Sequence, residues 1–280
     1  MYESFFSLRE PAFSLTPDPR FLWPSETHQE GFAALYYGIT RRKGFLLLTG
    51  DVGTGKTTLL RAVLSEIPTE IEVALLMNTA DLDSIDLFKL IAAELRLDGT
   101  FTSRADYLIA LNRFLLTRLE RGLNTVLVID EAQNLDRRLL EQVRLLSNLE
   151  TASEKLLQIV LTGQPELRDV LASPELAPLR QRIALEHHVQ RLRPEEIAPY
   201  LQHRIEVAGA RYEDLFAPGC EEIFYGFSAG CPRLLNLLAD RALLAGFSRQ
   251  ERPVRSALLE RKAKEMAEQQ ARSPLDPRRT

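Results

Sequence analysis

The sequence predicts an α/β fold, in which helices flank a parallel sheet, followed by a C-terminal all-helical lid domain. Three observations favour it: short apolar runs alternate with helical stretches, a glycine-rich loop follows the first run, and only helical stretches come after about residue 192. Strands that alternate with helices are joined by right-handed crossovers and form a parallel sheet that is covered on both faces. The 280 residues suffice for one such core and a smaller domain.

Five apolar runs are expected to form buried strands, and the stretches between and after them to form helices. The expected strands are 45–49, 73–77, 126–129, 156–161 and 183–189. The expected helices are 56–67, 84–96, 104–121 and 137–149 in the core, then 194–207, 218–227, 232–247 and 254–270 in the lid. Pro68 and Gly122 lie where the first and third core helices should end.

The changing pattern along the chain predicts four parts. Residues 1–43 should form an extended and helical segment that packs on the core, because its first part is rich in both proline and phenylalanine. Residues 44–191 should form the α/β core and residues 192–270 the helical lid. Residues 271–280 contain few apolar side chains and are predicted to be a flexible tail.

Composition and hydropathy argue against a disordered, a membrane-spanning and a secreted protein. The hydrophobic content of 45% is ordinary for a globular protein, and the formal net charge of −4 provides no global basic field for binding nucleic acid. No apolar run approaches the roughly 20 residues that span a bilayer, and the first residues do not read as a signal peptide. The chain is therefore expected to be soluble and cytoplasmic, with no transmembrane segment of its own.

The strongest motif follows the first predicted strand. Residues 50–57 read Gly-Asp-Val-Gly-Thr-Gly-Lys-Thr and fit the phosphate-binding P-loop pattern G-x-x-x-x-G-K-[ST]. Its glycines let successive N–H groups point at phosphate oxygens, and the next helix adds its positive end. Lys56 should reach the β- and γ-phosphates, and the Thr57 hydroxyl should hold Mg²⁺. The predicted residues that bind ATP are Gly50, Asp51, Val52, Gly53, Thr54, Gly55, Lys56, Thr57 and Thr58.

Two carboxylates follow the third predicted strand. Asp130 and Glu131 should lie at the carboxyl edge of the sheet, which is where ligands bind in open parallel sheets. We expect Asp130 to face the Mg²⁺ shell and Glu131 to polarise the attacking water. A solvated turn is the alternative, and the upstream loop argues against it.

Polar residues at the end of the fourth strand and three arginines are further candidates. Thr162 or Gln164 could contact the γ-phosphate or the water, unless they form an ordinary strand exit. Arg180 or Arg182 could act on the ATP of a neighbouring subunit, because a guanidinium stabilises charge on the transferred phosphoryl group. Arg233, at the start of a lid helix, could bind the γ-phosphate within the same subunit.

These segments, in this order, resemble the AAA+ ATPases, and the opening segment narrows the resemblance to the secretion ATPases of the general secretion pathway protein A family. The segments that carry it are 1–6, 11–13, 16–21 with His28, 43–45, 130–135, 161–167 and 230–233. The resemblance implies a P-loop core with a helical lid, Arg233 as the lid sensor, and an N-terminal segment that helps to enclose the adenine. A family member continues into a transmembrane helix and a peptidoglycan-binding domain; this chain is similar to the shorter pilus-biogenesis ATPases.

The resemblance implies an ATPase that binds and hydrolyses Mg-ATP to drive or switch assembly of a bacterial envelope secretion or type IV pilus-like system. The expected partners are further copies of the chain, in a nucleotide-dependent homo-oligomer, and envelope proteins that could hold it at the inner membrane. Two alternatives stay open. One is a DNA-handling AAA+ ATPase of the transposition-helper or origin-recognition type, and the other is a nucleotide-gated scaffold with little hydrolysis.

Overall fold

The computed structural model describes residues 1–77, 79–152 and 154–272, which form two compact units. Residues 26–52 and 59–189 make the α/β unit. Among the described residues, 1–25, 53–58 and 190–272 make the helical unit. Most of the predicted tail, residues 273–280, lies outside the described residues.

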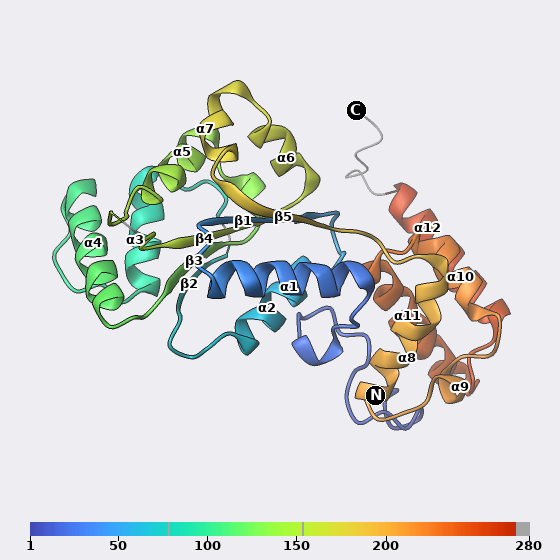
Figure 1. Cartoon of the computed structure of the whole chain (residues 1–280). Coiled ribbons are helices and arrows are strands. Elements are labelled where there is room, and N and C mark those ends of the chain that lie inside the picture. Colours follow the sequence, from blue (N-terminus) through green and yellow to red (C-terminus); the bar gives the residue numbers. More distant parts are fainter. Residues whose placement is uncertain (78, 153, 273–280) are drawn as a thin grey trace. The chain divides into compact units, whose positions relative to one another are not determined.

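The α/β unit is built on a five-stranded sheet whose neighbouring strands all pair in parallel (Figure 1). The strands are β1 (Phe45–Gly50), β2 (Glu72–Leu76), β3 (Thr125–Ile129), β4 (Gln158–Gly163) and β5 (Ile183–Val189), in the order β2-β3-β4-β1-β5. Each of the five apolar runs contains most of a strand, although β4 begins two residues later than predicted and β2 one residue earlier. The predicted fold class, a parallel sheet flanked by helices, is confirmed.

One face of the sheet is covered by α1 (Glu26–Thr40) and α2 (Lys56–Glu66). Two glycines of α1 allow a close approach. A Cβ at Gly38 would lie 2.4 Å from Leu46 Cδ2 of β1, and one at Gly31 would lie 2.9 Å from Leu59 Cδ2 of α2. Both contacts explain why these helical positions lack side chains.

The other face carries the larger apolar core of this unit. Phe45 and Leu47 of β1 alternate with Leu46 and therefore point to this side, where they join buried side chains of the helices. The helices are α3 (Ser84–Glu94), α4 (Arg104–Glu120), α5 (Arg137–Leu146), α6 (Pro165–Leu171) and α7 (Ala177–Arg180). Side chains immediately before α3, α4 and α5 cap their first turns, namely Asp83, Ser103 and Asp136.

The helical unit contains α8 (Ile197–Val207), α9 (Tyr212–Leu215), α10 (Cys220–Ser228), α11 (Pro232–Arg249) and α12 (Ser256–Arg272). Gly230, between α10 and α11, adopts a φ of 77°. A Cβ there would lie 1.9 Å from the Leu192 carbonyl oxygen, and the Leu192 N–H donates to the Gly230 carbonyl at 2.9 Å. Only glycine fits this turn, which places the start of α11.

The structure divides the predicted N-terminal segment 1–43 between the two units. Residues 1–25 belong to the helical unit, whereas α1 belongs to the α/β unit. Buried Arg204 of α8 donates to the carbonyl oxygens of Ala12 at 2.7 Å and Ser14 at 3.1 Å. Its guanidinium also lies 4.9 Å from the ring centre of Phe21, so that one side chain fixes much of this segment.

None of the described helices is long and apolar enough to cross a membrane.

Candidate nucleotide-binding and catalytic site

The glycine-rich loop leaves β1 at Gly50 and enters α2 at Lys56. Gly53 and Gly55 have φ values of 81° and 95°, in the left-handed region that favours glycine. Thr54 and Lys56 are buried, whereas Val52 is exposed. Residues 53–58 belong to the helical unit and residues 50–52 to the α/β unit, so the chain passes between the units inside the motif.

Asp130 lies directly after β3 and is held by the neighbouring strand. Its carboxylate accepts a hydrogen bond from the Thr162 hydroxyl of β4, and both side chains are buried. The Asp130 N–H donates to the Leu76 carbonyl of β2 at 2.9 Å. Two residues that were predicted separately, Asp130 and Thr162, are therefore brought together at the carboxyl edge of the sheet.

Glu131 is held by carboxamides rather than by a hydroxyl. Gln164 Nε2 donates to Glu131 Oε2 at 3.1 Å, and Gln133 Nε2 donates to the same oxygen. The Gln133 Oε1 in turn accepts the Gln164 N–H at 3.1 Å. A Cβ at Gly163 would lie 2.8 Å from that Oε1, which explains the glycine before Gln164. The two candidates of the fourth strand thus engage different carboxylates.

Sequence reasoning missed two members of this network. Gln133 lies in a short 3₁₀ helix (Ala132–Asn134) two residues beyond Glu131. Thr79 donates its hydroxyl to the Glu131 carbonyl at 3.3 Å, and it is buried. Gln133 lies within the 130–135 segment that carried the family resemblance, so its place in the chain was a usable signal; Thr79 offered none.

The two arginines proposed for action on a neighbouring subunit differ in their surroundings. Arg182 is half-buried and donates to the Ser147 hydroxyl and to the Arg144 carbonyl at 3.5 Å. Arg180 is exposed and donates to the Ala172 carbonyl at 3.1 Å. Arg182 therefore has structural partners inside its own unit, and Arg180 is the more accessible of the two.

Arg233 lies in the first turn of α11 within the helical unit. Its N–H donates to the Gly53 carbonyl of the phosphate loop at 3.2 Å. Its side chain is exposed and forms no hydrogen bond or ion pair in the described part of the chain. The predicted site residues thus divide between the two units. The carboxylate network, residues 50–52, Arg180 and Arg182 belong to the α/β unit, and residues 53–58 with Arg233 belong to the helical unit.

Two histidines of β5 take structural partners. His187 Nε2 lies 2.7 Å from the Thr27 carbonyl oxygen, and His188 Nδ1 lies 3.0 Å from the Thr49 hydroxyl. A Cβ at Gly31 would lie 2.8 Å from His187 Cδ2. These contacts hold β5 against α1 and β1.

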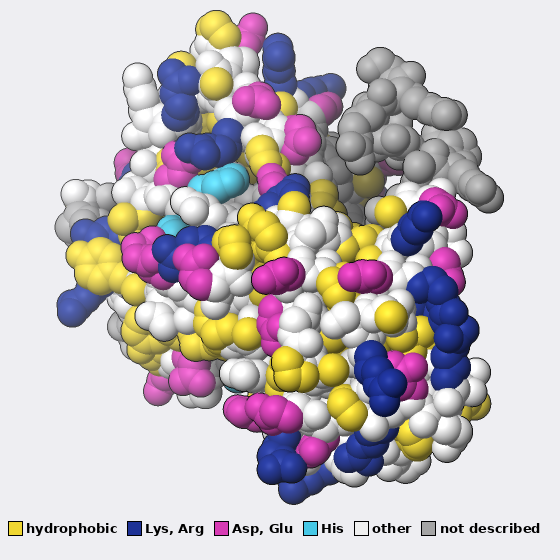
Figure 2. All heavy atoms as spheres, turned by 90° about the vertical axis from the view of Figure 1, so that its right-hand side faces the viewer, with side chains coloured by type: hydrophobic (Ala, Val, Ile, Leu, Met, Phe, Trp, Pro, Cys, Tyr) yellow, Lys and Arg dark blue, Asp and Glu magenta, His cyan; other side chains and the backbone are white. Residues whose placement is uncertain are grey.

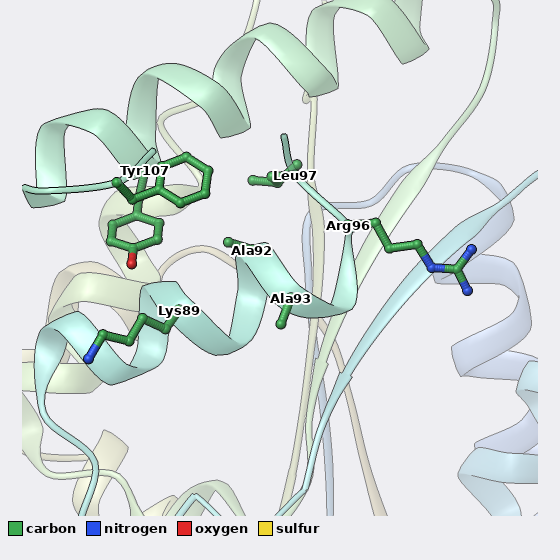
Figure 3. Close-up of a pocket in the computed structure, with 7 residues that line it drawn as sticks. Lys89, Ala92, Ala93, Arg96, Leu97 and Tyr107 are labelled. Carbon is green, nitrogen blue, oxygen red and sulfur yellow. The ribbon is translucent and has the colours of Figure 1, made fainter. Parts of the chain in front are cut away.

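A cavity of about 240 Å³ lies between α3 and α4 (Figure 3). Phe101 and Tyr107 stack at 4.4 Å between ring centres along its wall, and Lys89 and Arg96 extend outward in opposite directions. None of the predicted site residues lines it. This cavity is therefore separate from the nucleotide-binding motif.

The fold and these motifs define a class of protein. Residues 39–171 match the AAA domain family model, a span that includes the phosphate loop, Asp130 and Glu131. Residues 39–171 thus carry the AAA domain that this family model describes, together with its P-loop. Within that class the chain is related to general secretion pathway protein A of Aeromonas hydrophila, with 44% identity over 250 residues. That match covers 89% of this chain but 45% of the relative, so the chain spans less than half of the relative's length. The predicted resemblance to this family is confirmed.

Solved structures support the fold. Cdc6p from Pyrobaculum aerophilum superposes with a TM-score of 0.70 at 18% identity, covering 91% of this chain and 70% of that one. The ORC2 protein of Aeropyrum pernix, in its ADPNP–ADP complexes, gives 0.68 at 15% identity, covering 94% and 75%. At such identities the likeness concerns the fold alone.

Proposed function

We propose that the chain binds ATP with Mg²⁺ and hydrolyses it. The observation that carries this proposal is the network at the ends of β3 and β4, where Thr162 donates to Asp130 and Gln164 donates to Glu131. Polar groups arranged at the carboxyl edge of a parallel sheet are suited to a ligand. The AAA domain match and the phosphate loop supply the class of ligand.

Glu131 is proposed to polarise the attacking water. Both carboxamides donate to Oε2, and within the described residues no hydrogen bond reaches Oε1. The carboxylate is therefore oriented through one oxygen and can accept a water proton with the other. This arrangement suits a general base whose direction must be fixed.

Thr57 and Asp130 are proposed to hold Mg²⁺. A hydroxyl and a carboxylate are oxygen ligands, which Mg²⁺ prefers, and this ion usually keeps waters and phosphate oxygens rather than a cage of protein ligands. Among the described residues, no three or more His, Cys, Asp or Glu side chains form a metal-binding group. The Thr57 hydroxyl and the Asp130 carboxylate fit an ion that is also bound by the phosphates and neutralises their charge.

The phosphates themselves are proposed to lie on residues 50–58, with Lys56 at the β- and γ-phosphates. Gly53 and Gly55 have the left-handed backbone that turns N–H groups inward. Arg233, whose guanidinium has no partner in the described residues, is proposed to bind the γ-phosphate. Arg180 rather than Arg182 is proposed to act on a second copy, because Arg182 already donates to Ser147.

We propose that hydrolysis drives or switches assembly of an envelope secretion or type IV pilus-like system. The similarity to general secretion pathway protein A supports this role over nearly the whole of the described chain. Figure 2 shows acidic side chains among the basic ones on the face in view, rather than a continuous basic surface suited to DNA. Nucleotide-dependent self-association and contact with envelope proteins belong to the same proposal.

Steady-state ATP hydrolysis by the purified chain, over a range of protein concentrations and with or without duplex DNA, tests the proposal. Lys56→Ala should abolish turnover, and Glu131→Gln should lower it by about 100-fold or more while ATP remains bound. Glu120→Gln, at the far end of α4, serves as the matched carboxylate control and should change nothing.

Each alternative function has its own outcome in this experiment. Turnover that rises more than linearly with protein concentration and ignores DNA supports a self-assembling ATPase. Strong stimulation by DNA would instead favour the DNA-handling alternative. ATP binding with no turnover at any concentration would favour the scaffold, and unchanged turnover in Lys56→Ala would contradict the assignment of the loop.

A further inference from the structure

Helix α11 begins without a cap of its own. Its N-cap residue, Cys231, forms no side-chain capping bond, and Pro232 at the first helical position has no N–H to donate. The first donor of the helix is therefore the Arg233 N–H, which has no acceptor within the helix. It donates to the Gly53 carbonyl at 3.2 Å, so that the phosphate loop caps α11.

Gly53 is also too close to α11 to bear a side chain. A Cβ at this position would lie 2.6 Å from the Arg233 Cβ and 3.0 Å from the Cys231 Sγ. The first of these distances is shorter than real Cβ contacts, so any other residue would push the helix away from the loop. The φ of 81° at Gly53 independently favours glycine, because other residues rarely adopt a left-handed backbone.

We infer that Gly53 is a positioning residue that seats the first turn of α11 on the phosphate loop. The helix start and Arg233 are then attached to the loop through the main chain, with no side chain between them. This inference rests on the proposed function for the meaning of the loop. A loop that closes on phosphates moves the carbonyl that caps α11, and Arg233 moves with it. Nucleotide occupancy is thereby passed from the loop to α11, within the helical unit, through this backbone hydrogen bond.

The chain offers a matched control for the backbone strain. Gly44 has a φ of 83°, close to that of Gly53, but a Cβ there would meet no atom within 4 Å. Gly44→Ala therefore adds the strain of a left-handed alanine without the collision. Any effect of Gly53→Ala beyond that of Gly44→Ala therefore measures the collision between the new Cβ and the first turn of α11.

The test is hydrogen exchange at the Arg233 amide, followed by NMR in the nucleotide-free protein. We expect this amide to be protected in the wild type and in Gly44→Ala. In Gly53→Ala we expect it to exchange about tenfold faster, which corresponds to about 1.4 kcal/mol. An Arg233 amide that exchanges at an unprotected rate in the wild type would overturn the inference, and this holds even if Gly53→Ala fails to fold. A folded Gly53→Ala protein with wild-type protection would overturn it as well.

The coupling between nucleotide binding and the start of α11 is tested separately, by the same exchange measurement on the Glu131→Gln protein with and without ATP. We expect bound ATP to change the exchange rate of the Arg233 amide. Bound ATP that leaves this rate unaltered would overturn the coupling. Protection at Arg233 in a wild-type protein that binds no ATP would contradict the proposed function instead, so the two failures are distinguishable.

Discussion

The first turns of α4 and α11 are capped by different kinds of group. In α4, Ser103 Oγ accepts the Asp106 N–H at 3.3 Å, and Asp106 Oδ2 accepts the Ser103 N–H at 2.7 Å, so the cap comes from the helix itself. In α11 the cap is the carbonyl of Gly53, far away in the sequence. A helix with a local cap has its start fixed wherever it packs, whereas the start of α11 depends on the state of the loop.

Hydrogen bonds between residues that are far apart in the sequence, here called distant ties, occur in both units. In the helical unit, Arg204 of α8 binds the carbonyls of Ala12 and Ser14. In the α/β unit, Thr162 of β4 binds Asp130 after β3. If distant ties set the geometry of the molecule and local caps only support single helices, the distant ties should be the more costly to remove.

Removal of Arg204 should give the largest effect on stability. Arg204→Met replaces the guanidinium with an apolar side chain of similar length and leaves the carbonyls of buried Ala12 and of Ser14 without their donor, so we expect the free energy of unfolding to fall by about 3 kcal/mol. Urea unfolding would measure it. The control is Arg20→Met, because Arg20 pairs with Glu10 and Asp18 at the surface and should contribute much less. Equal losses of unfolding free energy in Arg204→Met and Arg20→Met would contradict the greater importance of the distant ties.

The tie between Thr162 and Asp130 should matter next, through activity. Thr162→Val keeps the shape of the buried side chain but removes the donor to Asp130, and we expect turnover to fall by about 10- to 100-fold, as for groups that orient a metal ligand. Thr162→Ser, which keeps the hydroxyl, should restore most of it. The measurement is steady-state hydrolysis across a range of Mg²⁺ concentrations, and wild-type turnover in the valine variant would contradict the proposed orienting role.

The local cap of α4 should show the smallest effect, and only as a dependence on pH. Hydrogen bonds from the N–H and hydroxyl of Thr102, and then from Ser103, lower the pKa of Asp106 from its ordinary 3.8 to about 2. Because the folded pKa is the lower one, this carboxylate stabilises the fold above about pH 4 and loses that contribution as the pH falls toward 2.

The measurement for this cap is urea unfolding at several pH values between 5 and 2. Asp106→Asn should be less stable than the wild type at pH 5, and the difference should shrink as the pH falls. Glu30→Gln, a change at an exposed carboxylate without a hydrogen bond in the described residues, should show no such convergence. A gap between Asp106→Asn and the wild type that stays constant with pH would contradict the role of the cap.

The sequence could predict features that depend on neighbouring residues, but not contacts between residues that are far apart in the chain. The sheet, the phosphate loop and the carboxylates after β3 depend on patterns a few residues long, and the fifth strand was placed at its observed bounds, Ile183–Val189. The choice between Thr162 and Gln164 could not be made, because it depends on which carboxylate each side chain meets across two strands. The link from Gly53 to α11 left no local trace either, since a P-loop pattern already accounts for that glycine.

Glu131 has a φ of 52° and a ψ of 43°, a left-handed conformation that glycine or asparagine adopts more easily. For a residue with a longer side chain this backbone costs about 1 kcal/mol. Laboratory evolution that selects for heat resistance alone should therefore drift toward Gly or Asn at this position and discard the carboxylate. A parallel selection that also demands nucleotide turnover should keep Glu131, so the divergence of the two populations at one codon would separate what the fold prefers from what the chemistry requires.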